Sequence, residues 1–182
     1  MAIIAGDLKF KRSLHTVAAS VGNGNTHDSE VDSLGGGVSA VELVSNQLHD
    51  LFDAVPSAES AAGRVEYRCF YVQNEHASLT LYDSKVFISN NTASVDSLIE
   101  IALDPVAVNG EDSSILLDDE TDSGSHLTAL TFVDAPSFES GLDIGNLAAG
   151  EQRAIWIKRT INAGAAAAAE DATIAIRGDT DA

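Results

Sequence analysis

The stretch EYRCFYV, residues 66–72, decides the fold, because it concentrates aromatic and β-favouring side chains in seven residues. It predicts a central β-strand. A second strong strand is predicted at 152–161, QRAIWIKRTI, where Ala154, Trp156 and Lys158 fall on one face and Ile155 and Ile157 on the other.

Shorter segments of β character surround these two strands and are separated by Gly, Asn and Asp. Strands recurring at this spacing without alternating helices are typical of an antiparallel sandwich. We therefore expect an all-β protein, an antiparallel β-sandwich of Ig-like or jelly-roll-like type, forming one domain over 1–182 with an N-terminal arm and loop at about 1–38. The further strands are expected at 8–12, 78–82, 85–89, 97–103, 130–133, 142–144 and 173–177.

One short helix and two long loops complete the expected architecture. Ser39 and Glu42 have capping-box spacing, and the apolar residues that follow predict a helix over 40–54 that ends before Pro56. Residues 20–38 and 109–126 are rich in Gly, Ser, Asn and Asp and predict loops. The Gly35-Gly36-Gly37 run could suggest a phosphate cradle, but no nucleotide-binding motif surrounds it, which favours a flexible turn.

Charge and length exclude several classes of protein. The chain has 182 residues with 10 basic and 28 acidic side chains, a formal net charge of -18. Such an excess argues against binding to nucleic acid or anionic membranes, which both need clustered cations. No apolar run approaches the roughly 20 residues that span a bilayer, and residues 1–13 do not have the pattern of a signal peptide. The single cysteine, Cys69, cannot form an intrachain disulfide, which favours synthesis in a reducing cytosol.

Motifs of catalysis and metal binding are missing from the sequence. The five histidines show no metal-ligand spacing, and neither HExxH nor GxSxG occurs. The acidic run 118–124 has oxygens at alternate positions but lacks the glycine and glutamate of an EF-hand loop, so a solvated loop is favoured over a looser cation site. We therefore expect no enzyme activity, no cofactor and no metal. Arg177-Gly178-Asp179 matches the integrin tripeptide, and we expect it to form a turn after a strand.

Two regions of opposite charge are candidate subunit contacts. The expected strand at 8–12 carries Lys9, Lys11 and Arg12, and the expected acidic loop carries Asp118, Glu120 and Asp122. If the two regions meet across a subunit boundary, assembly should weaken with salt. The alternative is an edge strand whose charges face water and block aggregation.

Several segments together resemble small virion structural proteins of tailed bacteriophages, most of which have no assigned role. The resemblance covers most of the chain, and its middle and C-terminal parts also resemble Ig-type modules. It rests on patterns and carries no catalytic residues. The segments are MAIIAGDLKF (1–10), SLGGG (33–37), LFDAV (51–55), AGRVEYRCFYVQNEHASLTLYDSKVFIS (62–89) and LDIGNLAAGEQRAIWIKRTINAGAAAAAEDATIAIRGDT (142–180).

The resemblance implies a non-enzymatic virion component made in the host cytoplasm. The expected position is on the head as a decoration protein, at the neck, or in the tail or baseplate, with other virion proteins and copies of itself as partners. A second hypothesis is a β-sandwich module that binds carbohydrate or a host surface. The low aromatic content of 5% and the expected placement of the only tryptophan inside a strand weaken this second hypothesis.

Overall fold

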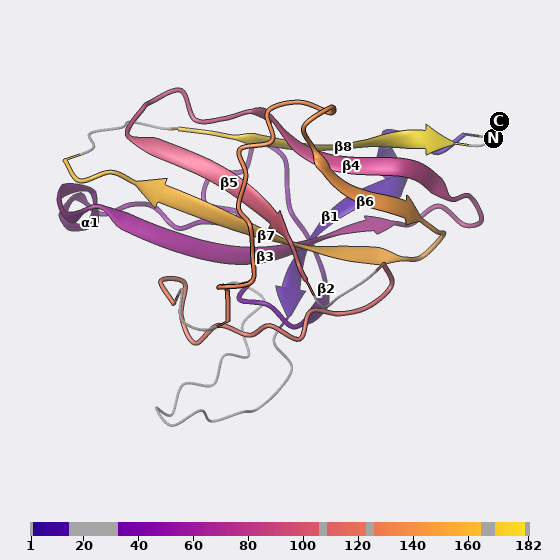
Figure 1. The fold of residues 1–182 in the computed structure, drawn as a ribbon, viewed down its shortest axis with the longest axis horizontal. Coiled ribbons are helices and arrows are strands. Elements are labelled where there is room, and N and C mark those ends of the chain that lie inside the picture. The colour runs from indigo at the N-terminus through magenta and orange to yellow at the C-terminus, as the bar shows by residue number, and fades with distance from the viewer. Residues whose placement is uncertain (1, 15–32, 106–108, 123–125, 165–169, 181–182) are drawn as a thin grey trace.

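The computed structural model describes residues 2–14, 33–105, 109–122, 126–164 and 170–180. Its elements form two antiparallel sheets, one of five strands in the order β2-β1-β3-β7-β5 and one of three in the order β6-β4-β8 (Figure 1). The prediction of an all-β antiparallel sandwich is confirmed. The elements are η1 (Ala5–Asp7), β1 (Leu8–Leu14), β2 (Gly37–Glu42), α1 (Ser57–Ala62), β3 (Arg64–Asn74), β4 (Leu81–Asn90), β5 (Ser97–Leu103), β6 (Leu142–Leu147), β7 (Gln152–Ile161) and β8 (Thr173–Thr180).

The two strong strands of the sequence form the central ladder of the larger sheet. β3 and β7 pair without interruption from Arg64 opposite Ile161 to Gln73 opposite Gln152. Side chains alternate along each strand, so Phe70 and Ile155 face the smaller sheet. The facing pair Cys69 and Trp156 belongs to a separate apolar cluster. The two faces predicted for 152–161 are therefore confirmed.

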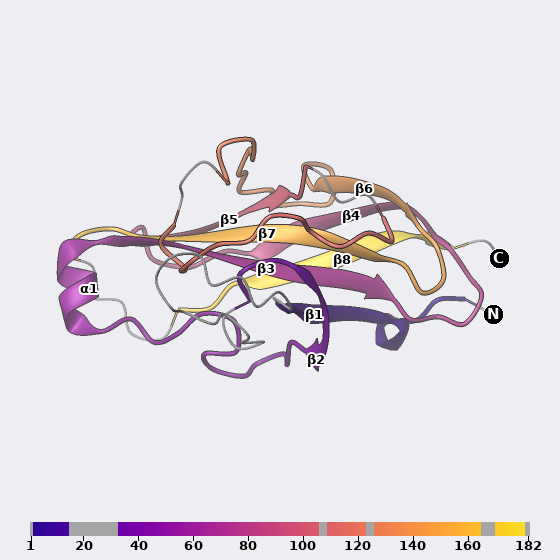
Figure 2. The ribbon, with the colours of Figure 1, turned by 90° about the horizontal axis from the view of Figure 1, so that it is seen from below.

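The main core lies between the sheets. Phe70 and Val72 of β3 and Ile155 and Ile157 of β7 pack with buried residues of the smaller sheet, which are Leu81, Val86, Ile88, Ile144 and Leu147. Figure 1 shows β4 and β8 above β3 and β7, and in Figure 2, which is seen from below, β8 overlaps β3 and β7. Removing such side chains from water is the largest favourable term in folding, at about 1.5–3 kcal/mol for each fully buried residue.

A second apolar cluster lies on the outer face of the five-stranded sheet. Trp156, Cys69 and Tyr71 belong to the sheet, and Leu34, Ile115, Leu117 and Leu127 pack against them from outside the strands as a cover. Short antiparallel bonds tie the cover together, since Gly36 N donates to Ile115 O at 3.2 Å and Leu117 N to Leu34 O at 3.0 Å. Both faces of the central ladder are thus buried, as its apolar sequence requires.

The helix predicted over 40–54 is wrong. β2 continues to Glu42, turns follow, and α1 begins only after Pro56. The Ser39 hydroxyl accepts a hydrogen bond from Val41 N at 2.9 Å inside the strand, and Asn46 and His49 have positive φ, which a helix excludes. The apolar residues of this segment follow no helical face, because Leu51 packs on the main core while Leu48 is 77% exposed.

Three smaller expectations are also corrected. Residues 78–82 and 85–89 do not form two strands, because β4 is one strand with a bulge at Asp83 and Ser84. At 130–133 only Val133 pairs, through an isolated bridge to Ile101. β1 lies between β2 and β3 and is not an edge strand. Most of the expected loop at 20–38 and the alanine run at 165–169 lie outside the described residues.

Candidate functional site

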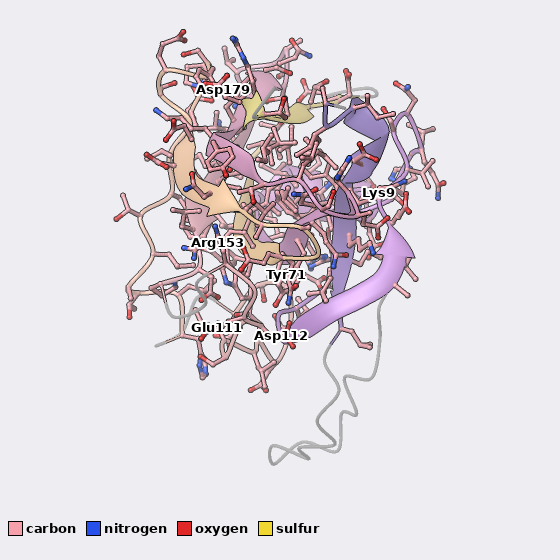
Figure 3. All side chains as sticks on the ribbon, turned by 90° about the vertical axis from the view of Figure 1, so that its right-hand side faces the viewer. Lys9, Tyr71, Glu111, Asp112, Arg153 and Asp179 are labelled. Carbon is pink, nitrogen blue, oxygen red and sulfur yellow. The ribbon has the colours of Figure 1, made fainter. Side chains whose placement is uncertain are left out.

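The basic side chains of β1 pair with carboxylates of the same chain. Lys9 Nζ lies 3.0 Å from Glu42 on β2, Arg12 Nη2 lies 3.1 Å from Asp50, and Lys11 forms an ion pair with Glu75. Figure 3 shows Lys9 on the same end of the molecule as Tyr71 and Asp112. Each cation of β1 therefore has an acidic neighbour, and only Glu42 lies on an adjacent strand. The sequence pattern did not indicate these partners.

Of the three candidate residues in the acidic loop, Glu120 contacts the larger sheet. Glu120 pairs with Arg64, lies 3.7 Å from Arg68 Nη1, and its backbone oxygen accepts a bond from Tyr67 N at 2.7 Å. Asp118 is exposed and Asp122 is half-buried. No ion pair between the described residues joins this loop to the cations of β1. A contact between the two regions across a subunit boundary stays a prediction.

A turn within the same loop holds Asp119. Its Oδ1 accepts bonds from Thr121 Oγ1 at 2.6 Å and from Thr121 N at 2.7 Å. These hydrogen bonds to the ionised form, first of all the one from the hydroxyl, lower the pKa of Asp119. Part of the acidic run therefore has a defined local turn, and Asp118 and Asp119 are exposed to solvent, as expected for a solvated loop.

A buried ionic cluster at one end of the sandwich escaped sequence analysis. The Glu66 carboxylate, on a residue only 2% exposed, lies 2.9 Å from Arg64 Nε and accepts a bond from Arg159 Nε at 2.7 Å. The Arg159 guanidinium also lies over the Phe52 ring, 4.5 Å from its centroid. The cluster connects β3, β7 and the 43–55 segment, so it fastens the covering segment to the sheet.

Replacing Glu66 by glutamine is expected to lower the free energy of unfolding by about 2–3 kcal/mol, because the half-buried Arg64 and Arg159 would lose the buried negative charge that they share. The matched control is Glu42→Gln in the more exposed pair with Lys9, where the expected loss is below about 1 kcal/mol. Urea unfolding followed by far-UV circular dichroism measures both. Equal effects of the two substitutions would contradict the assignment.

A second buried polar group lies under the outer-face cover. Asp104 Oδ2 accepts a bond from Trp156 Nε1 at 2.9 Å and another from the Ser113 hydroxyl. The Tyr71 hydroxyl accepts a bond from Ser113 N at 2.7 Å and donates to Gly36 O. Burial raises the pKa of Tyr71, with a smaller contribution from nearby acidic groups. Ser113 and Asp104 are both buried, so this group fastens the cover to the sheet and presents no reactive atom to a substrate.

Arg153 borders this group at the end of the molecule that Figure 3 faces. Its Nη2 donates to the backbone oxygen of Asp104 at 3.2 Å, and burial lowers its pKa. Gln152 beside it reaches Asp112 Oδ1 at 3.2 Å. These contacts join β7 to the start of the covering loop.

Cys69 is the only thiol, and it is fully buried next to Trp156. Burial raises the pKa of its thiol, and the charge of Asp104 raises it further. The structure places it as a small apolar residue of the outer cluster, as its sequence neighbours indicated.

We expect the native protein to react with a thiol-specific aromatic disulfide reagent at least about a hundredfold more slowly than the chain in concentrated urea, because reaction requires both exposure and a thiolate. Absorbance of the released thiolate measures both rates, and the unfolded chain should yield one equivalent. Comparable rates in the two states would contradict the burial of Cys69.

Metal ligation and membrane insertion can be assessed for the described residues. Within them, no three His, Cys, Asp or Glu side chains gather closely enough to hold a metal ion. His15 and His27 fall outside these residues. In the same described part of the chain, no helix has the length and hydropathy to cross a bilayer.

The Arg-Gly-Asp sequence lies within β8 and does not form the turn expected after a strand. Arg177 is opposite Lys85 of β4, and Asp179 is opposite Tyr82. Gly178 packs against the β4 bulge so closely that a Cβ would come within 2.6 Å of the Tyr82 carbonyl oxygen. The glycine therefore serves the packing of two strands.

An aromatic and cationic cluster covers part of the outer face of the smaller sheet. The Phe138 ring lies against Phe87, with 6.3 Å between ring centroids. Arg177 and Lys85 lie over the same ring, at 4.9 and 5.6 Å from its centroid. This is a surface where half-buried aromatic rings and two cations meet.

Searches for related proteins found no matching family model, no matching curated protein and no matching solved structure. The resemblance to tailed-phage virion proteins therefore rests on the sequence segments quoted above.

Proposed function

We propose that the chain is a non-enzymatic structural component of a tailed-bacteriophage virion. It would be an accessory subunit on the head, neck, tail or baseplate, present in several symmetric copies and bound to other virion proteins. The observation that carries the proposal is the use of its buried polar side chains. Glu66, Asp104 and Ser113 all bind other parts of the fold, as expected of a building block.

The charge distribution supports the same role. The cations of β1 and of the Glu66 cluster are engaged by carboxylates of the chain itself. With 28 acidic against 10 basic residues, the rest of the surface stays strongly negative. Such a surface favours solubility and opposes non-specific association before assembly. The exposed Asp118 and the half-buried Asp122 are candidate contacts to a neighbouring virion protein.

Mass spectrometry of purified particles of the phage whose genome encodes the chain tests the proposal. We expect the chain at a copy number that fits a symmetric position, after density-gradient purification. A replication protein encoded by the same phage is the control, because its absence shows that the particles are free of lysate proteins. Particles that lack the chain would reject the proposal, and a cryo-EM map of positive particles would locate it.

A second candidate function is binding to a carbohydrate or host surface. The Phe138 cluster favours it, because an aromatic ring flanked by Arg177 and Lys85 suits a sugar that carries a carboxylate. The only tryptophan is fully buried and cannot take part in this binding. A glycan array probed with the purified chain and with its Phe138→Ala variant tests the idea, which requires binding that the variant loses.

A further inference from the structure

Two of the four outer strands in the two sheets, β5 and β6, have their free edges occupied by hydrogen bonds. On β5, the Asn91 side chain binds both backbone groups of Ile99, donating to its oxygen at 2.8 Å and accepting from its nitrogen at 3.1 Å. Further along the same edge, Ile101 exchanges two backbone bonds of 2.9 Å with Val133. These contacts block the edge of β5 against another strand.

The edge of β6 is occupied in a similar way, whereas the edge of β2 is occupied only near the start of the strand. The Asn109 amide donates to Ile144 O at 2.7 Å and to Asn146 O at 2.5 Å, which covers the outer side of β6. On β2, the backbone nitrogen of Val38 donates to Asp112 Oδ1 at 3.4 Å. A loop side chain therefore closes the edge of β6 as well.

β8 has a longer open edge than β2. Its ladder is formed with β4 alone, from Thr173 opposite Asn90 to Thr180 opposite Leu81. Among the described residues, no other backbone–backbone bond involves β8. Figure 1 shows it along the upper side of the molecule, with β4 beside it. An eight-residue strand with an open edge is a template for pairing with another chain.

Natural proteins often protect such an edge with charges that repel another strand. β8 instead carries one cation and one anion, Arg177 and Asp179. Arg177 and Asp179 are both exposed and, being two residues apart, lie on the same face of the strand. In an antiparallel pair, the side chains of facing residues lie on the same face of the sheet. Because faces alternate along a strand, two identical strands can pair only about a two-fold axis that passes through one residue. An axis through Arg177 would place arginine opposite arginine, whereas an axis through Gly178 places Arg177 opposite Asp179 of the other copy, twice.

We propose that the open edge of β8 binds β8 of a second copy, antiparallel and centred on Gly178. The two three-stranded sheets would then form one continuous sheet of six strands across a two-fold axis. The self-complementary charges favour a second copy over a foreign strand. The inference stands on the sheet edge alone and does not require the virion role.

Charge reversals test the register. Arg177→Glu places two acids opposite each other, and Asp179→Lys places two cations opposite each other, whereas the double variant restores opposite charges. Sedimentation equilibrium over about 1 µM to 1 mM would measure dimerisation, a range in which weak interfaces dissociate. We expect a dimer for the unmodified protein, a loss of affinity on the order of tenfold for each single reversal, and recovery in the double variant.

The Asp179→Lys variant shows whether a change in dimer affinity comes from the proposed register or from general repulsion between negatively charged chains. It makes each chain less negative, so repulsion between chains with a net charge of -18 would fall and non-specific association would strengthen. The proposed register requires weaker association instead. Lys85→Glu is the matched control, because Lys85 contacts the same Phe138 ring from β4 and its loss should leave the dimer intact. Circular dichroism confirms that each variant is folded.

Two results would overturn the inference. One is a chain that stays monomeric over the whole concentration range. If that monomeric chain is found in virions, the proposed function stands and only the dimer is rejected. The other is an oligomer whose affinity does not change with the single reversals. Amide hydrogen exchange gives a second measure, since protection of 176–180 should rise with protein concentration in the unmodified chain and not in Asp179→Lys.

Discussion

Replacing Trp156 by alanine is expected to lower the free energy of unfolding by about 4 kcal/mol. Trp156 is fully buried on the outer face of the larger sheet, between its strand neighbours and the covering residues Leu34, Ile115 and Leu117. Alanine would leave a cavity under this cover, and it would remove the donor that binds Asp104 Oδ2 at 2.9 Å. A buried carboxylate that loses a hydrogen bond adds to the cost of the cavity.

Trp156→Phe is the matched control, because phenylalanine retains much of the apolar volume and lacks the indole donor. Its expected cost is about 1–2 kcal/mol. Urea unfolding followed by far-UV circular dichroism serves all variants, and tryptophan fluorescence can confirm the curve of the unmodified protein, which has one tryptophan. A loss below about 1 kcal/mol for the alanine variant would mean that the cover does not pack on Trp156 as described.

Replacing Gly35 by alanine is expected to cost about 3 kcal/mol or more, and it could prevent stable folding. Gly35 has a φ of 102°, which disfavours any side chain. A Cβ at this position would also lie 2.0 Å from the Ile115 backbone oxygen and 3.2 Å from Trp156 Cη2. Because the nearer atom belongs to the backbone, relief requires the covering segments to move apart.

The Gly150→Ala variant separates the cost of the positive φ from the cost of the steric contact. Gly150 has a φ of 83°, but a Cβ there would have nothing within 4 Å, so only the backbone conformation is penalised. We expect a cost of about 1–2 kcal/mol for this control. Thermal unfolding of both variants under the same conditions gives the comparison. If Gly35→Ala proved no worse than Gly150→Ala, the close contact between residues 35 and 115 would be refuted.

The two central strands could be predicted from sequence because their local pattern and their tertiary role agree. Residues 66–72 and 152–161 combine β-favouring side chains with apolar residues on both faces, and both faces are indeed buried. The sandwich followed from the spacing of the shorter strands. Its strand order could not be predicted, because β3 pairs with a strand far away in sequence.

The segment that misled the prediction shows where local pattern fails. Residues 40–54 contain enough apolar residues for a helix, yet they serve as an irregular cover in which Leu51 faces the main core and Val44 and Leu48 are exposed. Asp50 is used twice here, accepting a bond from Val44 N at 2.7 Å and pairing with Arg12. Such tertiary bonds override helix propensity and leave no periodic trace in the sequence.

The candidate site could be predicted only in part. The cations of β1 stand out by their spacing, but their partners Glu42, Asp50 and Glu75 come from three different segments. Glu66 and Asp104 are single acids in a chain with 28 acidic residues, so composition cannot distinguish them from surface carboxylates. Only the register of β3 with β7 places Glu66 opposite Arg159.

The pairing of β3 with β7 also imposes an order in time. β3 ends at Asn74, but its long ladder cannot form until the ribosome has delivered Ile161, with β4, β5 and β6 synthesised in between. During this interval β3 can pair only with β1, and its other edge has no partner strand within the sheet. Long-range pairing of this kind slows folding and exposes unpaired strands to aggregation. A cell that makes the protein at high concentration must therefore keep incomplete chains apart until β7 has been synthesised and can pair with β3.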